Sequence, residues 1–217
     1  MKNSLVQWFR HNRFTSEWAA LLALRKKTNY LKEVGWFRSF KQHLPIDIQE
    51  VTLPWYTYGA IDFLSKRINP DMAVFEYGSG NSTFWWASHV TRVVSCEHDR
   101  QWYDKLKPCL PNNVEYHHFE FKPSGEYSKA ILQYDHEFDV IVIDGKDRVL
   151  SAKNSLTALK GTGIIIWDNS DRDQYKDGYA WLIKNSFKQL DFSGMGPVNA
   201  YGWCTSIFYR SVNCLGI

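Results

Sequence analysis

The segment that decides the fold is Val74-Phe75-Glu76-Tyr77-Gly78-Ser79-Gly80-Asn81-Ser82-Thr83, in which an apolar run meets two glycines and then a helical stretch. Glycines let the backbone turn sharply and approach a ligand closely, and the first turn of a following helix offers unpaired N–H groups. The segment therefore predicts a strand, a tight turn and a helix, with a nucleoside-type ligand at the turn.

Apolar runs and helical stretches alternate along the chain around this turn. Continuous apolar runs such as residues 140–143 suit strands that helices cover on both faces, as in a parallel sheet. Residues 128–134 are expected to form either a helix or a loop. Strands are expected at 72–77, 92–97, 114–121, 138–143 and 164–167, and helices at 57–68, 83–90, 102–106 and 151–159, the last ended by the glycines at 161 and 163.

The C-terminal end departs from this alternation. Residues 189–192 and 205–209 are strand-like and are joined by a glycine-rich loop without a helix, which favours an antiparallel hairpin. The whole pattern predicts an α/β fold, with a doubly wound, mostly parallel, Rossmann-like sheet of seven strands and an antiparallel hairpin at one edge.

Residues 4–43 carry helical periodicity mixed with many basic residues. We expect residues 1–50 to form an N-terminal helical extension packed on the core, and residues 51–217 to form the main domain. Because aromatic and basic residues coincide in the extension, the alternative is an amphipathic membrane-surface element or a dimerisation element, which would make the protein a homodimer. The recurring apolar residues are Leu5, Trp8, Phe9, Trp18, Leu21, Leu22 and Leu24.

Composition limits the function classes. The chain of 217 residues is 44% hydrophobic and 23% charged, which is typical of a soluble globular protein with one sizeable core. The net charge of +3 comes without a run of five like charges, so nucleic acid is not an expected partner. The ten Trp, twelve Tyr and thirteen Phe indicate either a bulky core or an aromatic-lined pocket for a flat or sugar-like ligand.

Cysteine usage and hydropathy bear on the compartment. The four cysteines lack a CxxC or metal-finger spacing, so we expect free buried thiols in a reducing compartment. The longest apolar run near the N-terminus, residues 18–24, is too short to span a bilayer, and charged residues precede it, unlike a signal peptide. The expected location is the cytoplasm, without a transmembrane segment.

An acidic residue ends the second predicted strand, about 20 residues beyond the glycine turn. In nucleoside-binding α/β folds an acid at this place accepts hydrogen bonds from the ribose hydroxyls. Glu97 occupies that position, and Asp99 is expected to be an exposed loop charge. A dinucleotide-binding turn would have a third glycine where Thr83 stands and an apolar residue where Glu76 stands, which disfavours a nicotinamide-dependent oxidoreductase.

Glu76, Gly78 and Gly80 resemble the first motif of the class I S-adenosylmethionine-dependent methyltransferases, an acidic residue followed by glycines at alternate positions. Ser82 replaces the third glycine of that motif. The resemblance covers roughly residues 70–210 at the level of pattern and implies that S-adenosylmethionine is the cofactor. The implied cofactor-binding residues are Glu76, Gly78, Ser79, Gly80, Ser82 and Glu97, with Glu76 near the methionine end and Glu97 at the ribose.

Two further acidic loops follow the fourth and fifth predicted strands. Ligands of open α/β sheets lie beyond the carboxyl ends of the strands, so Asp144 and Asp168 are expected at the same crevice as Gly78. Asp144 with Asp168 and Asn169 also resembles the divalent-metal site of catechol-type O-methyltransferases, which implies Mg²⁺ or Ca²⁺ on these oxygen ligands. The alternative is that Asp144 contacts the substrate directly as a base.

The charged residues beside these loops have two interpretations. Lys146 is a candidate for removing or stabilising the proton of the acceptor, so Asp144, Lys146 and Asp168 are the candidate catalytic residues. Arg148 and Arg172 would in a purely structural role form ion pairs with their neighbours at 147 and 171.

The resemblance implies a methyltransferase that acts on oxygen or nitrogen of a small-molecule or glycan-like acceptor. The alternative is a catalytically silent protein of the same fold that binds a partner through its helical N-terminal segment.

Overall fold

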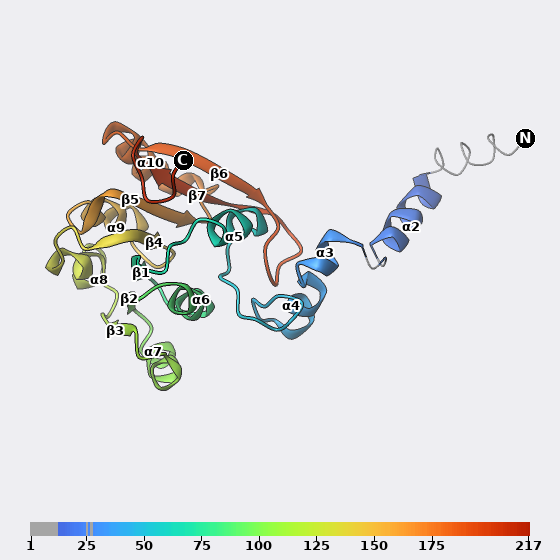
Figure 1. Ribbon diagram of the computed structural model, residues 1–217, viewed down its shortest axis with the longest axis horizontal. Helices are drawn as coiled ribbons and strands as arrows, with labels where there is room; N and C mark the ends of the chain where they lie inside the picture. Colours follow the sequence, from blue (N-terminus) through green and yellow to red (C-terminus); the bar gives the residue numbers. More distant parts are fainter. Residues whose placement is uncertain (1–12, 25, 27) are drawn as a thin grey trace, which may run out of the picture.

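The structure, a computed structural model, describes residues 13–24, 26 and 28–217. Helices lie on both faces of one seven-stranded sheet (Figure 1). The expected helical periodicity at Leu5, Trp8 and Phe9 lies outside the described residues. The strands are β1 (Ala73–Tyr77), β2 (Arg92–Glu97), β3 (Val114–His118), β4 (Phe138–Ile143), β5 (Leu159–Asp168), β6 (Lys188–Gly194) and β7 (Trp203–Tyr209).

The helices follow the strands as the alternating pattern predicts, with short 3-10 turns (η) beside some of them. The α-helices are α2 (Arg13–Ala23), α3 (Tyr30–Glu33), α4 (Trp36–Gln42), α5 (Tyr58–Ser65), α6 (Asn81–His89), α7 (Arg100–Leu106), α8 (Glu126–Lys129), α9 (Arg148–Ser155) and α10 (Lys176–Lys184). The 3-10 turns are η1 (Lys107–Cys109), η2 (Ala130–Gln133) and η3 (Asp173–Tyr175).

The strand order is β3-β2-β1-β4-β5-β7-β6, which confirms the predicted doubly wound sheet with an edge hairpin. β3, β2, β1, β4 and β5 are parallel, and β7 runs antiparallel to both β5 and β6. The chain moves outward from β1 to β3 and then crosses back to place β4 on the other side of β1. Ligands of such sheets bind where the order reverses, so the expected crevice lies between the ends of β1 and β4.

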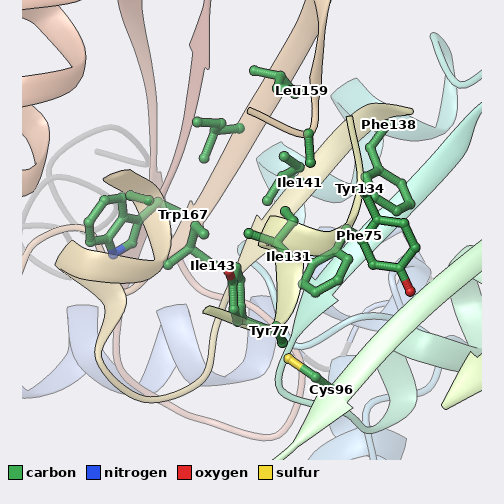
Figure 2. Packing of buried hydrophobic residues seen from close by; sticks show 14 of the residues in the cluster. Phe75, Tyr77, Cys96, Ile131, Tyr134, Phe138, Ile141, Ile143, Leu159 and Trp167 are labelled. Atoms are coloured by element: carbon green, nitrogen blue, oxygen red, sulfur yellow. The ribbon is translucent and has the colours of Figure 1, made fainter. Parts of the chain in front are cut away.

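Side chains of the central strands alternate between two cores. Phe75, Tyr77 and Ile143 face one side with α8, η2, α9 and α10, as Figure 2 shows. Val74 and Val142 face the other side, where α5 and α6 cover them. A fully buried Val or Ile contributes about 1.5–3 kcal/mol relative to an exposed one, so both faces stabilise the sheet. Many aromatic side chains belong to these cores, and others line a cavity described below.

The structure differs from the sequence prediction at β5, α9 and α10, among other elements. β5 begins at Leu159, so Gly161 and Gly163 lie inside the strand rather than ending a helix. α9 begins at Arg148, three residues earlier than expected. α10 was not predicted. Its Gly178 is needed because a Cβ there would approach the indole of Trp167 to 2.5 Å. The close packing of α10 on β5 thus requires glycine at a position inside the helix.

The cysteines are free as expected, but not all of them are buried. The four cysteines are free, and Cys96 is buried, but Cys109 is exposed because it ends the surface turn η1. Within the described part of the chain, none of the helices has the length and apolar character needed to cross a bilayer.

The N-terminal segment contacts the main domain through α4. The indole nitrogen of Trp36 donates to the carbonyl of Asn199 (2.8 Å), and the amide of Val198 donates to the hydroxyl of buried Ser39 (2.9 Å). Both partners lie in the loop between β6 and β7. In contrast, the described side chains of α2 are exposed, and α2 extends away from the sheet in Figure 1.

Candidate active site

The turn after β1 lies directly beside the end of β4. Gly78 has a φ of +96°, and a Cβ on it would lie 3.4 Å from the backbone of Asp144. The amide of Asp144 donates to the carbonyl of Tyr77 (3.1 Å), and the amide of Gly78 donates to that of Cys96 (2.9 Å). The left-handed backbone therefore favours glycine here, and the two loops lie within van der Waals contact of each other.

Gly80 has a different environment. Its φ of 166° is extended backbone, and a Cβ built on it would meet no protein atom within 4 Å. Neither backbone strain nor a protein contact therefore demands glycine at this position. The open space in front of Gly80, at the N-terminus of the nine-residue helix α6, is a place where a ligand can approach the backbone closely.

Glu76 is buried at the end of β1, with 1% of its surface exposed. Its Oε2 accepts hydrogen bonds from the hydroxyls of Thr83 (2.5 Å) and Ser95 (3.4 Å), while Oε1 has no partner. Burial raises the pKa of Glu76 to about 8, against the opposing effect of the nearby hydroxyls of Ser82, Thr83 and Ser95. A buried carboxyl with a vacant oxygen is a binding position for a cation or another donor.

Glu97 ends β2 and binds the other side of the same turn. Its Oε2 accepts from the hydroxyl of Ser79 (2.6 Å), and its Oε1 accepts from the amides of His98 (2.7 Å) and Asp99 (2.9 Å). Asp99 caps α7 by accepting from the amide of Trp102 (2.9 Å). Glu97 thus lies in the position expected from its spacing, held at the turn by Ser79.

A cavity of about 340 Å³ joins these residues. It is lined by Gly78, Ser79, Ser82, Glu97, Trp102 and Asp144, among others. The indole nitrogen of Trp102 donates to the carbonyl of Ser79 (3.0 Å), which fixes a large aromatic side chain at the rim. Sequence reasoning did not include Trp102, which lies on a separate helix from the turn.

Arg148 connects the loops after β4 and β5. Its guanidinium is buried and forms an ion pair with Asp144 (2.9 Å), and it also donates to the carbonyls of Gly145 (3.0 Å) and Asp168. The expected pairing with Asp147 is wrong. Asp147 has a left-handed backbone with φ 48°, and its carboxylate accepts from the amide of Ser124 instead (3.0 Å).

Asp168 is 3% exposed at the end of β5. Its Oδ1 accepts from the indole of Trp203 (3.0 Å) and the hydroxyl of Thr205 (2.6 Å). Burial, followed by the negative charge of Asp144, raises the pKa of Asp168 to about 7. Burial also raises the pKa of Asp144, although Arg148 opposes this shift. Burial thus favours the protonated form of both acids, and the negative charge of Asp144 adds to this effect at Asp168.

A second cavity, of about 410 Å³, extends from this pair toward the edge hairpin. It is lined by Asp144, Asp168, Asn169 and the aromatic residues Trp55, Tyr201 and Trp203, among others. Tyr201 and Trp203 come from the end of the β6–β7 loop and the start of β7, and sequence reasoning did not include them as site residues. Their signal in the sequence is the glycine-rich loop that joins two strands without a helix.

Lys146 lies apart from Asp168. It is exposed and lines a neighbouring cavity of about 540 Å³ together with Asp144, Arg148 and Arg172. The structure thus places Lys146 beside one of the candidate acids only. Asp171, the expected partner of Arg172, accepts a hydrogen bond from the amide of Cys204 (3.2 Å).

Solved structures share the fold of this chain. A methyltransferase from Geobacter sulfurreducens is similar to the chain with a TM-score of 0.52 and 16% identity, covering 90% of this chain and 96% of that one. Precorrin-6y C5,15-methyltransferase from Geobacter metallireducens has a TM-score of 0.57 and 16% identity, covering 77% and 98%. The chain has a methyltransferase fold.

Other proteins share the methyltransferase fold. Spermidine synthase from Thermotoga maritima is similar with a TM-score of 0.50 and 17% identity, covering 67% of this chain. The chain spans 55% of the length of that enzyme. No protein-family model matches the sequence, and no curated protein matches it. At these identities the likeness establishes the fold, and the activity has to be argued from the site.

Two of the residues expected to hold a divalent cation are engaged in other contacts. Oδ1 of Asp144 is paired with the guanidinium of Arg148, and Oδ1 of Asp168 accepts from an indole and a hydroxyl. In the part of the chain that the structure describes, no group of three or more His, Cys, Asp or Glu side chains is placed to hold a metal ion. A cation at Asp144 would also lie beside the positive charge of Arg148, which opposes its binding.

Proposed function

We propose that this protein binds S-adenosylmethionine at the turn after β1 and transfers its methyl group to an oxygen or nitrogen atom of a small-molecule or glycan-like acceptor. The observation that carries this proposal is the position of Asp144. It lines the cavity beside Gly78 and Glu97 and also the cavity beside Asp168, so the two spaces meet at the end of β4. A donor and an acceptor on either side of Asp144 would lie close enough to react.

The residues of the first cavity suit the cofactor. Bound S-adenosylmethionine supplies a methyl group on a positively charged sulfonium. Glu97, oriented by Ser79, accepts from the ribose hydroxyls, as acids at this position do in nucleoside-binding folds. The unpartnered Oε1 of Glu76 accepts from the ammonium group at the methionine end. Gly78 and Gly80 let the backbone approach the ligand, and Ser82 lines the same cavity.

The second cavity suits an acceptor that carries hydroxyl or amino groups. Trp55 and Tyr201 present exposed aromatic faces, on which a sugar or other ring can pack. Asp168 is the candidate base, because a pKa of about 7 lets it accept a proton from the acceptor at neutral pH. Asp144, held by its ion pair with Arg148, lies between this base and the cofactor turn. Lys146, on the far side of Asp144, contributes positive charge at the neighbouring cavity.

The cofactor assignment is tested by replacing Gly80 with alanine. Because the added Cβ points into open space, Gly80→Ala should fold and melt like the wild type, yet bind S-adenosylmethionine at least about tenfold more weakly. Isothermal titration measures the affinity. Gly161→Ala is the matched control, since its Cβ also meets no protein atom within 4 Å, and it should change neither property.

Two results would overturn the proposal. One is the absence of binding by the wild-type protein up to about 1 mM cofactor, which would favour the catalytically silent, partner-binding alternative. The other is unchanged affinity in Gly80→Ala, which would place the ligand elsewhere. Tight binding of a reduced nicotinamide cofactor, followed by fluorescence, would point to the oxidoreductase class instead.

A further inference from the structure

The helix α2 exposes a large apolar face. Trp18, Leu21 and Leu22 are 60, 55 and 60% exposed, and steps of one, three and four residues place them on one side of the helix. Together with Leu24 and with Phe37 of α4, they line a cavity of about 200 Å³. The apolar face therefore continues from α2 onto α4.

The helix that carries this face lies away from the sheet. In Figure 1, α2 lies at the blue end, beyond α3 and α4 and far from the sheet. Phe40 is also exposed on α4. The ring centroid of Trp36 lies 5.1 Å from that of Phe37 and 5.0 Å from that of Phe40, so the three rings form one cluster. A contiguous apolar patch of this kind on a soluble protein marks an interaction site.

The distribution of charge along the chain indicates the partner. Residues 1–43 contain nine Lys and Arg against two Glu, whereas residues 44–217 contain 17 Lys and Arg against 21 Asp and Glu. A second copy of the chain would bring the same positive charge against this face, which repulsion disfavours. An anionic surface is complementary to it. The cations at the ends of α2 or next to them in the sequence are Arg10, Arg13, Arg25, Lys26 and Lys27.

We propose that the face formed by Trp18, Leu21, Leu22 and Phe37 docks on an anionic lipid bilayer. Apolar and aromatic side chains on one face of a helix, with Lys and Arg nearby, are the features of helices that lie in the plane of a membrane interface. The apolar side chains enter the headgroup boundary, and the flanking cations contact the lipid phosphates. This docking is independent of the proposed chemistry, because none of these residues lines the two cavities that meet at Asp144.

Vesicle co-sedimentation of the full chain tests the proposal. The wild type should sediment with vesicles of phosphatidylcholine and phosphatidylglycerol in equal amounts, but not with phosphatidylcholine alone. Raising the salt from about 0.1 M to about 1 M should weaken binding, because the screening length falls from about 10 Å to about 3 Å. Trp18→Ala combined with Leu22→Ala should reduce partitioning at least about tenfold. Lys26→Gln combined with Lys27→Gln, which removes two of these cations, should reduce it about fivefold for each cation near the surface.

Matched variants on α10 and β6 serve as controls. Ile183→Ala removes an exposed apolar side chain, and Lys184→Gln combined with Lys188→Gln removes two exposed cations. Both should bind vesicles like the wild type, and thermal melting should show that all variants are folded.

Three results would overturn the proposal. The first is the absence of binding to the anionic vesicles, and the second is equal binding to neutral ones. The third is a dimer in analytical ultracentrifugation that the Trp18 and Leu22 substitutions abolish, without vesicle binding, since a second copy would then cover the face.

Discussion

The hydroxyl of Thr83 donates a hydrogen bond to the buried carboxyl of Glu76 and at the same time accepts one from the amide of Gly80. One side chain thus ties the end of β1 to the turn and to the first turn of α6. A third glycine, as in dinucleotide-binding turns, would leave both groups without this partner. Thr83 stands where a dinucleotide-binding turn has its third glycine, and Glu76 stands where such a turn has an apolar residue. The first of these two departures therefore supports the second through a hydrogen bond.

Replacement of Thr83 by valine should destabilise the protein by about 1–3 kcal/mol, because it leaves buried polar groups unpaired at nearly constant volume. For a chain of this size, each kcal/mol corresponds to a fall of about 2–4 °C in Tm. Calorimetry measures the change. Thr157→Val, which removes a hydroxyl that caps an exposed turn, should melt within a degree or so of the wild type. An equal effect of both substitutions would contradict a special role for Thr83.

The stability contribution of Glu76 should depend on pH. Its pKa rises from 4.5 to about 8 on folding, so the native state binds the proton more tightly than the unfolded state. The contribution is therefore favourable at low pH and is lost as the pH rises through this interval. The free energy of unfolding of the wild type should therefore fall relative to that of the neutral variant Glu76→Gln as the pH rises from about 5 to about 8. Urea denaturation at both ends of the interval measures this fall. A fall of the same size relative to the exposed Glu120→Gln would contradict this assignment.

The pKa of Asp168 predicts the pH dependence of catalysis. The base must be ionised to accept a proton, so kcat/KM should fall below about pH 7 and reach a plateau above it. Asp168→Asn should lower kcat about 10²–10⁴-fold and abolish this limb, while cofactor affinity stays unchanged. Titration and a pH profile with any acceptor that the protein methylates provide the measurement. The exposed Asp173→Asn is the control. An unaltered pH profile in Asp168→Asn would exclude Asp168 as the base.

Arg148 should matter for stability more than surface arginines do. Arg148→Gln leaves Asp144 and the carbonyls of Gly145 and Asp168 without their shared donor, at a cost of about 3–5 kcal/mol. The Arg100–Asp104 pair is exposed and has the same spacing of four residues, so Arg100→Gln should produce no resolvable change in urea denaturation. Equal stability of the two variants would show that the loops after β4 and β5 do not depend on Arg148.

Much of the fold can be predicted from the sequence, since the decisive signals are local. The apolar run at residues 138–143 and the run at 92–97 coincide with β4 and β2 as the structure has them. The glycine turn lies at the point where the strand order reverses. Other glycines did not mark the ends of helices or strands. Gly163 lies within β5, and Gly178 lies within α10 because Trp167 packs against it.

The acceptor side of the site was harder to predict, because its residues come together only through tertiary contacts. Tyr201 and Trp203 are far in sequence from Asp144, and no spacing rule joins them to it. In the purely structural alternative, Arg148 would pair with its neighbour Asp147. The left-handed backbone at Asp147 directs that carboxylate to Ser124 instead, and Arg148 turns to the strand ends. Pairing between sequence neighbours is a weak prediction wherever the backbone between them has unusual dihedral angles.

The two hydrogen bonds from α4 to the β6–β7 loop have a mechanical consequence. Asn199, which accepts from Trp36, also lines the cavity that holds Asp168. A displacement of the N-terminal segment would therefore be transmitted through Trp36 to Asn199 in the wall of this cavity. If α2 lies on a bilayer as proposed, the hydrogen bond between Trp36 and Asn199 would connect the membrane-bound segment to the wall of the cavity that contains the candidate base.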